Sequence, residues 1–208
     1  MSRPKVVLAT RNPAKLAELR RILAGVPGLD VELVGLEALP GIGEVAETGA
    51  TFAANALLKA HAVARAAGLP AVADDSGLTV DALGGMPGVL SARWSGRHGD
   101  DAANLALVLA QLADVPVERR GAAFVCAAAV VVPEVGERVV EGRLRGVLAA
   151  EPRGSNGFGY DPVFVPVGGA RSTAEMSPAE KDAISHRGVA FRRLAPLLGE
   201  LLHRPAGR

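Results

Sequence analysis

The chain contains very little cysteine, few aromatic residues and almost no net charge. Its 208 residues include one cysteine, Cys126, which lies inside an apolar run and cannot form an intrachain disulfide. This composition excludes a secreted disulfide scaffold. A single cysteine in an apolar run is typical of a buried structural thiol in a reducing compartment, so the sequence predicts a cytoplasmic protein.

The chain also lacks an excess of either charge and any long hydrophobic segment. It has 23 basic and 22 acidic side chains, so no bulk field attracts nucleic acid or an anionic membrane. The longest apolar run, residues 122–132, is too short to span a membrane, and the apolar stretch before Thr10 is too short for a secretory signal. We expect neither a nucleic-acid nor a membrane partner, and local cations must bind any anionic ligand.

Lysine is scarce among the basic residues. Only four of the 23 are lysines, namely Lys5, Lys15, Lys59 and Lys181. Arginine presents a planar fork of donors, whereas lysine carries a compact charge on a flexible stem. Because the chain uses arginine almost everywhere else, Lys15, Lys59 and Lys181 indicate positions that need a point charge.

Composition and patterning predict one domain over residues 1–208. A hydrophobic content of 49% is enough for one well-buried core at this length. Apolar runs predict strands over residues 5–9, 31–36, 71–73, 121–132 and 138–148. Helical spacing and capping residues predict helices from Asn12 and Pro13 onward, from Ser177 onward, and over residues 51–67, 100–113 and 189–202.

The first motif joins a strand to a helix N-terminus. Residues 10–15 follow the strand over residues 5–9, and Asn12 with Pro13 forms a good pair for the N-cap and first helical positions. Free backbone N–H groups and the helix dipole attract anions there, and Lys15 opposes the dipole unless an anion is bound. We therefore predict a phosphate site, with simple helix capping as the alternative. The Walker pattern is absent.

The second motif is the adjacent acid pair Asp74 and Asp75. The short strand over residues 71–73 ends at this pair, and residues 76–77 are predicted to turn. Neighbouring carboxylates repel each other and are more stable beside a cation, which a hard divalent ion such as Mg²⁺ would supply. A polar turn without chemistry is the alternative interpretation.

A third group of candidates lies on the Gly-rich loop over residues 40–47 and on the helix that follows. Asn55 and Lys59 are four residues apart and therefore share one face of the predicted helix. Lys59 beside Glu47, at the end of the loop, would form one wall of a site. A solvated lysine on an exposed helix is the alternative.

Two stretches nearer the C-terminus have the chemistry of a base pocket. Residues 154–162 interleave glycines with Phe158 and Tyr160, and an aromatic ring on such a loop suits stacking under a flat base, at about 1–3 kcal/mol per stack. Residues 185–188 supply serine, histidine and arginine donors ahead of the last predicted helix. Core packing of the aromatic rings and simple helix capping are the alternatives.

Together these motifs resemble the inosine and xanthosine triphosphate pyrophosphatases, enzymes that remove deaminated purine nucleotides from the cellular pool. The resemblance covers nearly the whole chain. Its motifs are Thr10-x-Asn-x-x-Lys15, Glu47-Thr-Gly, Asn55 to Lys59, Asp74-Asp-Ser-Gly77, Gly84-Gly-x-Pro-Gly88, Phe158-Gly-Tyr-Asp161, and Lys181 to Ser185-His-Arg-Gly188. Each motif is short, but their joint order and spacing are specific.

The resemblance implies a Mg²⁺-dependent hydrolase that cleaves ITP, dITP, XTP and dXTP between the α and β phosphates, releasing pyrophosphate. It also implies an elongated α/β domain with a mixed, twisted sheet, two lobes with the active cleft between them, and a homodimer. A pyrophosphatase for modified pyrimidine nucleotides and a non-catalytic nucleotide-binding protein are the alternatives. The first motif argues against a pyrimidine nucleotide pyrophosphatase. The intact acid pair argues against a non-catalytic protein.

The resemblance also assigns roles to individual residues. It implies that Asp75 is the general base and that Glu47 and Asp75 bind the metal. Ser76 would touch the substrate, and Phe158 would stack on the base. The triphosphate would be bound by Thr10, Arg11, Asn12, Pro13, Ala14, Lys15 and Lys59, and the base pocket would be lined by Gly159, Tyr160, Asp161, Lys181, His186 and Arg187.

Overall fold

The computed structural model describes residues 3–39 and 41–204. Pro40, the first residue of the predicted Gly-rich loop, and both ends of the predicted domain over residues 1–208 therefore lie outside the described residues. The chain divides into two compact units. Unit 1 consists of the described residues up to Asp75, residues 126–142, and those from Arg187 onward, and unit 2 of residues 76–125 and 143–186. Each unit thus combines segments that are far apart in the sequence.

Six strands form one mixed sheet. They are β1 (Lys5–Leu8), β2 (Glu32–Gly35), β3 (Ala71–Val80), β4 (Gly121–Val132), β5 (Gly136–Leu148) and β6 (Phe164–Pro166), in the order β2-β1-β3-β4-β5-β6. β1 pairs in parallel with β2 and β3, with Val7 opposite Val34 and Ala71, whereas β5 and β6 are antiparallel. The predicted α/β class and mixed sheet are confirmed, while the elongated shape and the cleft between lobes stay predictions.

The α-helices begin at the capping residues that the sequence predicts, with one exception. They are α1 (Pro13–Ala24), α2 (Phe52–Ala67), α3 (Asp101–Gln111), α4 (Pro178–Ile184) and α5 (His186–Leu202). α5 starts before the predicted residue 189, because only Ser185, with an extended backbone, separates it from α4. Among the described helices, none is long and apolar enough to cross a membrane.

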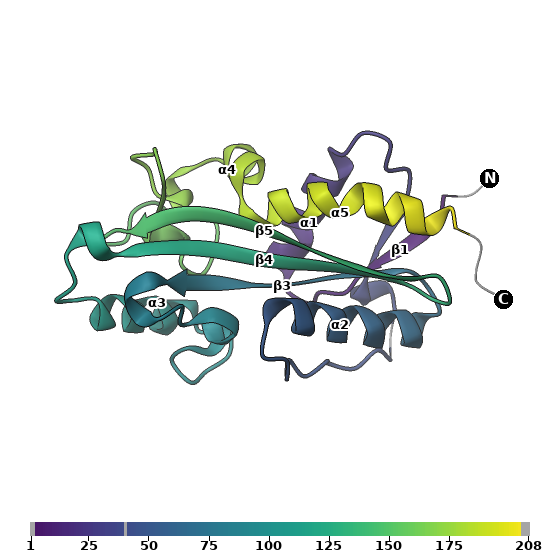
Figure 1. Ribbon diagram of the computed structural model, residues 1–208, viewed down its shortest axis with the longest axis horizontal. Helices are drawn as coiled ribbons and strands as arrows, with labels where there is room; N and C mark the ends of the chain where they lie inside the picture. The colour runs from purple at the N-terminus through teal and green to yellow at the C-terminus, as the bar shows by residue number, and fades with distance from the viewer. Residues whose placement is uncertain (1–2, 40, 205–208) are drawn as a thin grey trace. The chain divides into compact units, whose positions relative to one another are not determined.

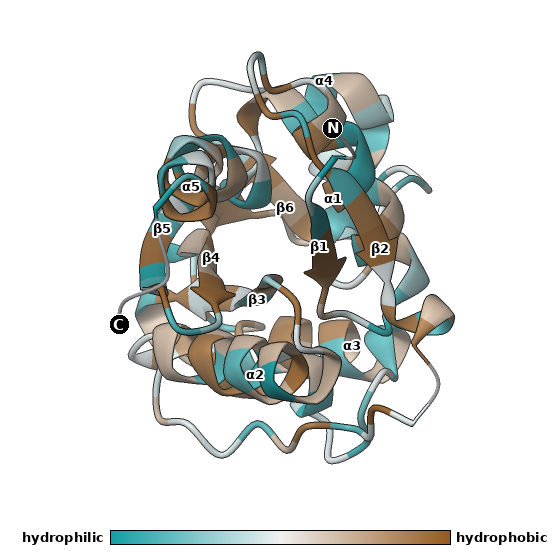
Figure 2. Ribbon diagram, turned by 90° about the vertical axis from the view of Figure 1, so that its right-hand side faces the viewer, coloured by the Kyte–Doolittle hydropathy of each residue, from teal (hydrophilic) through white to brown (hydrophobic). Residues whose placement is uncertain are grey.

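Unit 1 has a hydrophobic core on each face of its part of the sheet. Side chains alternate along a strand, so Val6 and Leu8 of β1 pack with α1 and α5, while Val7 packs with α2. Figure 1 shows α1 and α5 on one side of these strands and α2 on the other. Small residues such as Ala56 and Ala60 of α2 face the sheet. Both faces of β1 are therefore buried, and β1 is brown along most of its length in Figure 2.

Unit 2 has a hydrophobic cluster built from β3, β4, β6 and α3. Phe124 and Phe164 contribute rings whose centroids lie 4.3 Å apart, and Tyr160 is buried in the same cluster. Trp94, the single tryptophan of the chain, packs against this cluster and donates from Nε1 to Gln111 at 2.8 Å. Tyr160 thus belongs to the core of unit 2, and Trp94 covers its edge.

β3 continues through the acid pair, which corrects the turn predicted at residues 76–77. The Leu78 N–H donates to Ser91 Oγ at 2.9 Å, and a Cβ at Gly77 would overlap the Ser91 side chain. Gly77 therefore permits the close approach of a neighbouring segment to an intact strand. Asp, Ser and Gly remain in the strand because packing decides the backbone here, and turn propensity does not.

Candidate functional site

The buried acid pair on β3 organises the charged residues of unit 1. Asp74 and Asp75 are 2% and 5% exposed, respectively. As neighbours on one strand, they point to opposite faces of the sheet: Asp74 follows Val72 on the side of α1 and α5, and Asp75 follows Ala73 on the side of α2. With their partners they form the acid–lysine cluster, which consists of Lys15, Glu18, Glu47, Asn55, Lys59, Asp74, Asp75 and Arg187.

Two cations from two helices contact Asp74. Its Oδ2 lies 3.3 Å from Lys15 Nζ of α1 and 3.2 Å from Arg187 Nε of α5. Nη1 of Arg187 also pairs with the buried carboxylate of Glu18 on α1. Burial raises the pKa of Asp74, but Lys15 and Arg187 outweigh it and hold that pKa well below its usual value. Asp74 is therefore ionised at neutral pH, and its carboxylate holds the ammonium group of Lys15, which lies in the first turn of α1.

Asp75 has a different environment from its neighbour. Nδ2 of Asn55 donates to its Oδ2 at 2.9 Å, and Lys59 Nζ lies 3.9 Å from its Oδ1 and 2.7 Å from Oε1 of Glu47. Burial raises the pKa of Asp75, and the nearby Lys59 ammonium does not cancel this effect. Burial lowers the pKa of Lys59, but the surrounding carboxylates raise it above its usual value. Asp75 is thus a stronger base than an exposed aspartate, beside a charged lysine.

Residues 10–15 form the predicted helix entry in unit 1. Asn12 is the N-cap of α1: its side chain accepts the Lys15 N–H at 3.1 Å, and its own N–H donates to Thr10 Oγ1 at 3.2 Å. Arg11 donates to the carbonyl oxygen of Ile42. The exposed residues of this stretch are Arg11, Asn12, Pro13 and Ala14. The helix end is open to solvent, as a phosphate site requires, and phosphate binding itself stays a prediction.

The predicted metal ligands, Glu47 and Asp75, both lie near Lys59. In the acid–lysine cluster the carboxylates of Glu18, Glu47, Asp74 and Asp75 outnumber the cations Lys15, Lys59 and Arg187 by one. Oxygen ligands in negative surroundings suit a hard divalent cation such as Mg²⁺, which often takes one or two protein carboxylates and completes its shell with water and phosphate oxygens. This donor set fits such an ion, although the described residues contain no group of three or more Asp, Glu, His or Cys side chains that could hold a metal.

Asp161 organises the Gly-rich loop of unit 2. Its Oδ2 accepts the Phe158 N–H at 2.9 Å and lies 2.5 Å from Lys181 Nζ, and its Oδ1 accepts from the Thr173 hydroxyl at 2.7 Å. The Lys181 ammonium lies 5.0 Å from the centroid of the Phe158 ring, within cation–π range. A Cβ at Gly157 would overlap the Asp161 carboxylate, which explains the glycine. The Asp161 cluster consists of Phe158, Asp161, Thr173 and Lys181.

Tyr160 and Gly159 also anchor this loop. Tyr160 is buried, and its hydroxyl donates to the Ser91 carbonyl oxygen at 2.9 Å. The Gly159 N–H donates to Oδ2 of Asp101 at 2.8 Å. Core packing, one of the two interpretations of the aromatic pair, is therefore confirmed for Tyr160, whereas Phe158 is partly exposed. Contact of either residue with a base stays a prediction.

The remaining predicted residues are divided between the units. Ser76 continues β3 in unit 2, and His186 of unit 2 stacks on Phe124 with ring centroids 4.9 Å apart. Arg187 belongs to unit 1, where the acid–lysine cluster surrounds its guanidinium. The neighbours His186 and Arg187, predicted as one group of donors, thus have separate environments, and their contact with a base stays a prediction.

Comparison with known proteins identifies the family. Residues 6–197 match the model of the Ham1 family. The chain belongs to this family. A dITP/XTP pyrophosphatase from Streptomyces avermitilis is 64% identical over 198 residues, which cover 95% of this chain and 98% of that protein. Another from Frankia alni is 67% identical over 203 residues, with coverage of 95% and 98%. The resemblance predicted from the motifs is confirmed.

A solved structure supports the same relationship. The crystal structure of a nucleoside-triphosphatase, or dITP/XTP pyrophosphatase, from Mycobacterium abscessus is 63% identical and aligns with a TM-score of 0.74. The alignment covers 93% of this chain and 99% of that chain. The two proteins therefore share one fold over nearly their full lengths.

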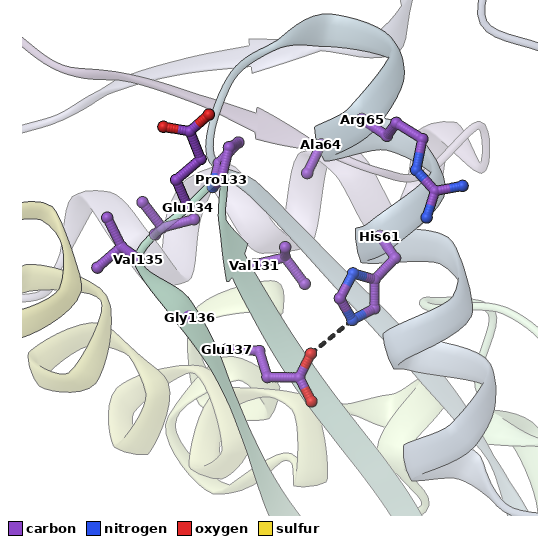
Figure 3. Close-up of a pocket in the computed structure, with 10 residues that line it drawn as sticks. His61, Ala64, Arg65, Val131, Pro133, Glu134, Val135, Gly136 and Glu137 are labelled. Carbon is purple, nitrogen blue, oxygen red and sulfur yellow. Dashed lines mark hydrogen bonds and ion pairs between the residues drawn. The ribbon is translucent and has the colours of Figure 1, made fainter. Parts of the chain in front are cut away.

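A pocket of about 530 Å³ lies between α2 and the turn that joins β4 to β5 in unit 1 (Figure 3). His61 points toward Glu137, with Nε2 2.5 Å from Oε2, while Arg65 and Glu134 add one charge of each sign. None of the site residues predicted for this Ham1 chain lines the pocket. The pocket is therefore separate from the candidate site, and its mixed charges favour neither an anion nor a cation.

Sequence reasoning missed two buried partners of the Ham1 site residues. Glu18 lies one helical turn after Lys15, and this spacing is a signal that could have placed both on one face of α1. Thr173 is 1% exposed and contacts Asp161 from a short 3₁₀ segment, Thr173–Glu175. No local pattern indicates this contact, because the two residues are 12 positions apart in separate 3₁₀ segments with β6 between them.

Proposed function

We propose that the chain hydrolyses the deaminated purine nucleotides ITP, dITP, XTP and dXTP to the monophosphate and pyrophosphate. The relatives at 64% and 67% identity are dITP/XTP pyrophosphatases. The observation that carries the proposal is Asp75, a buried carboxylate of raised pKa beside Lys59 and Glu47. A base next to a fixed cation suits hydrolysis of a bound phosphoanhydride.

In the proposed reaction Asp75 takes a proton from the attacking water. The water oxygen forms a bond to the α-phosphorus while the bond from that phosphorus to the α–β bridging oxygen breaks, so that pyrophosphate leaves with the electron pair of the broken bond. Asn55 supports this role, because its Nδ2 donates to Oδ2 of Asp75 at 2.9 Å and so orients the carboxylate. Positioned general bases contribute about 10²–10⁴-fold to such reactions.

Lysines and backbone donors would bind the triphosphate. Lys15 lies at the N-terminus of α1, where the dipole and the N–H groups favour an anion. A flexible ammonium follows the changing charge on a phosphate better than a planar fork does. Thr10, Arg11, Asn12, Pro13 and Ala14 would line the same end, and Lys59 would contact the phosphates from α2.

Glu47 and Asp75 would bind Mg²⁺ in this proposal. The ion would neutralise part of the phosphate charge when it is bound. The excess negative charge of the acid–lysine cluster supports this assignment. Removal of divalent ions with a chelator should abolish turnover, and added Mg²⁺ should restore it.

The Asp161 cluster would bind the base, with Phe158 stacking on the ring. Lys181 would donate to a 6-keto oxygen, and the same role for His186 and Arg187 stays a prediction. Adenine carries a 6-amino donor in that place, which would leave buried donors unpaired. Sites built on such a hydrogen bond lower kcat/KM for a substrate that cannot form it by roughly 10⁴–10⁵-fold. The partly exposed Phe158 ring and the Lys181 ammonium 5.0 Å from its centroid support this assignment.

We also propose that the enzyme acts as a homodimer in the cytoplasm. Cys126 is fully buried, and burial raises the pKa of its thiol, so it is inert toward disulfide exchange. Such a thiol is compatible with a reducing compartment. Sedimentation at several protein concentrations tests the dimer, and a single monomeric species would contradict it.

A panel of nucleoside triphosphates with and without Mg²⁺ tests the proposed function. We expect pyrophosphate from ITP and XTP, little turnover of ATP, and no orthophosphate. The variant Asp75→Asn is the matched control, because it keeps the size of the side chain. Orthophosphate as the product, or turnover of ATP equal to that of ITP, would overturn the proposal.

A further inference from the structure

The Asp161 carboxylate depends on a residue outside the recognised motifs. Thr173 is 1% exposed, and its Oγ1 lies 2.7 Å from Oδ1 of Asp161. The other carboxylate oxygen, Oδ2, is already shared by the Phe158 N–H and Lys181 Nζ. Thr173 therefore contacts the oxygen that neither of these donors uses, and it restricts rotation of the carboxylate.

The segment that carries Thr173 braces the Gly-rich loop at further points. The Ser172 hydroxyl donates to the Arg153 carbonyl oxygen at 2.7 Å. The Asn156 backbone N–H donates to the Ala174 carbonyl oxygen at 3.0 Å, and Asn156 Nδ2 donates to the Met176 carbonyl oxygen at 2.9 Å. All three bonds end on backbone carbonyl oxygens. The Thr173 hydroxyl also lies 3.2 Å from the Asp161 carbonyl oxygen, but its shorter contact, at 2.7 Å, is with the carboxylate that accepts the Phe158 N–H and pairs with Lys181.

The orientation of the Asp161 carboxylate affects two groups, the Phe158 ring and the Lys181 ammonium. Asp161 Oδ2 fixes the backbone at Phe158 and the ammonium of Lys181, and this ammonium lies 5.0 Å from the Phe158 ring centroid. Rotation of the carboxylate would therefore move the ring and the cation together. A hydrogen bond to a charged acceptor is among the stronger ones in a protein, so its loss has a measurable effect.

We propose that Thr173 is a positioning residue of the base pocket, acting through the Asp161 carboxylate on Phe158 and Lys181. The proposal rests on the proposed function for its kinetic test. It deepens that function by adding a residue that makes selective base binding depend on one buried hydroxyl.

The kinetic test compares Thr173→Val with Thr173→Ser. Valine removes the hydroxyl at nearly constant volume, and serine keeps it. We expect Thr173→Val to raise KM for ITP about 10-fold, equivalent to about 1.4 kcal/mol, with kcat within about twofold of wild type. Thr173→Ser should keep both constants within about twofold. An unchanged KM in Thr173→Val, or equal damage in both variants, would overturn the proposal.

A spectroscopic test is independent of activity. We expect the Phe158 amide to exchange with solvent faster in Thr173→Val than in wild type or Thr173→Ser, as measured by NMR. The Gly159 amide, which donates to Asp101, is the internal control and should not change. Equal acceleration at both amides would indicate general loosening of the loop and would overturn the proposal.

Two further measurements keep the test decisive. In the Asp161→Asn background, Thr173→Val should add little to KM, because residues that act through one another are not additive. Additive effects would contradict the proposal.

If valine is not tolerated, Thr173→Ala removes the same hydroxyl and carries the same expectations. If wild type releases no pyrophosphate from ITP, the proposed function fails, while amide exchange still tests Thr173.

Discussion

The two units stabilise their buried carboxylates in different ways. In unit 1, Asp74 lies between Lys15 and Arg187, cations from two different helices. In unit 2, Asp161 accepts from a hydroxyl and a backbone N–H in addition to Lys181. The first arrangement balances charge between rigid elements, and the second fixes the geometry of a loop.

This difference predicts different responses to mutation. Removing one partner from a buried ion pair leaves an uncompensated charge, which is strongly destabilising. Removing one hydrogen bond from a loop displaces groups by a small amount and costs less. Substitutions in the acid–lysine cluster should therefore affect chemistry and stability strongly, and substitutions in the Asp161 cluster should mainly affect substrate binding.

The largest expected effect separates the two adjacent acids. Asp75→Asn keeps an acceptor for Asn55 but removes the proposed base, so kcat should fall by at least about 10²–10⁴-fold in a folded protein. Asp74→Asn should instead lower stability, because Lys15 and Arg187 lose their shared carboxylate. Steady-state kinetics and urea unfolding of both variants measure this contrast. Near-normal turnover in Asp75→Asn would remove its assigned role.

The next effect tests charge balance without touching the proposed base. Glu18→Gln removes the buried partner of Arg187, and breaking such a pair costs about 3–5 kcal/mol of the free energy of unfolding. The matched control is Glu37→Gln, which removes an exposed partner 2.8 Å from Arg20 and should cost less than about 1 kcal/mol. Urea denaturation measures both changes. Equal losses in the two variants would contradict the comparison.

A smaller effect tests whether lysine is needed as such. Lys15→Arg and Lys59→Arg keep the charge but replace a compact ammonium by a planar fork. Each should lower kcat/KM for ITP by about 10–100-fold, the scale of one hydrogen bond to a charged group. Lys5→Arg is the control, because Lys5 is largely exposed and lies 3.9 Å from Glu32. Wild-type kinetics in both site variants would show that the scarcity of lysine is a coincidence.

The smallest effect concerns a cap at the surface of unit 2. Hydrogen bonds from Arg171 and Ser177 lower the pKa of Glu180 to about 2, from an ordinary value of 4.5. Because the folded-state pKa is depressed, ionised Glu180 adds to the free energy of unfolding above pH 4.5. This contribution is lost as the pH falls toward 2. Glu180→Gln should therefore flatten the acid side of the stability profile, measured by urea unfolding at several pH values. Parallel profiles would argue against this linkage.

Local patterns predicted much of the fold and the candidate site. The N-caps Asn12 and Ser177 and the strands β4 and β5 follow from short-range chemistry, so the sequence reveals them. The scarcity of lysine led to Lys15 and Lys59, both of which lie next to the acid pair. Features that depend on residue type and near-neighbour spacing were therefore accessible.

Features set by distant packing were not accessible from the sequence. The turn predicted at residues 76–77 was wrong, because β3 continues to Val80 and Ser91, 14 positions beyond Gly77, packs against that glycine and accepts the Leu78 N–H. Arg187 reaches Glu18 across 169 positions, and this separation leaves no periodic signal. The predicted start of the last helix was late for a similar reason, since one extended residue suffices to join α4 to α5.

The aromatic residues have a consequence for how the molecule is observed. The chain has one tryptophan and one tyrosine, Trp94 and Tyr160, and both belong to unit 2. Fluorescence and near-ultraviolet absorption therefore report almost entirely on unit 2, whereas far-ultraviolet circular dichroism reports on the helices of both units. Denaturation curves that coincide for these signals would mean that the units melt cooperatively. Curves that diverge would mean that unit 1 and unit 2 unfold separately.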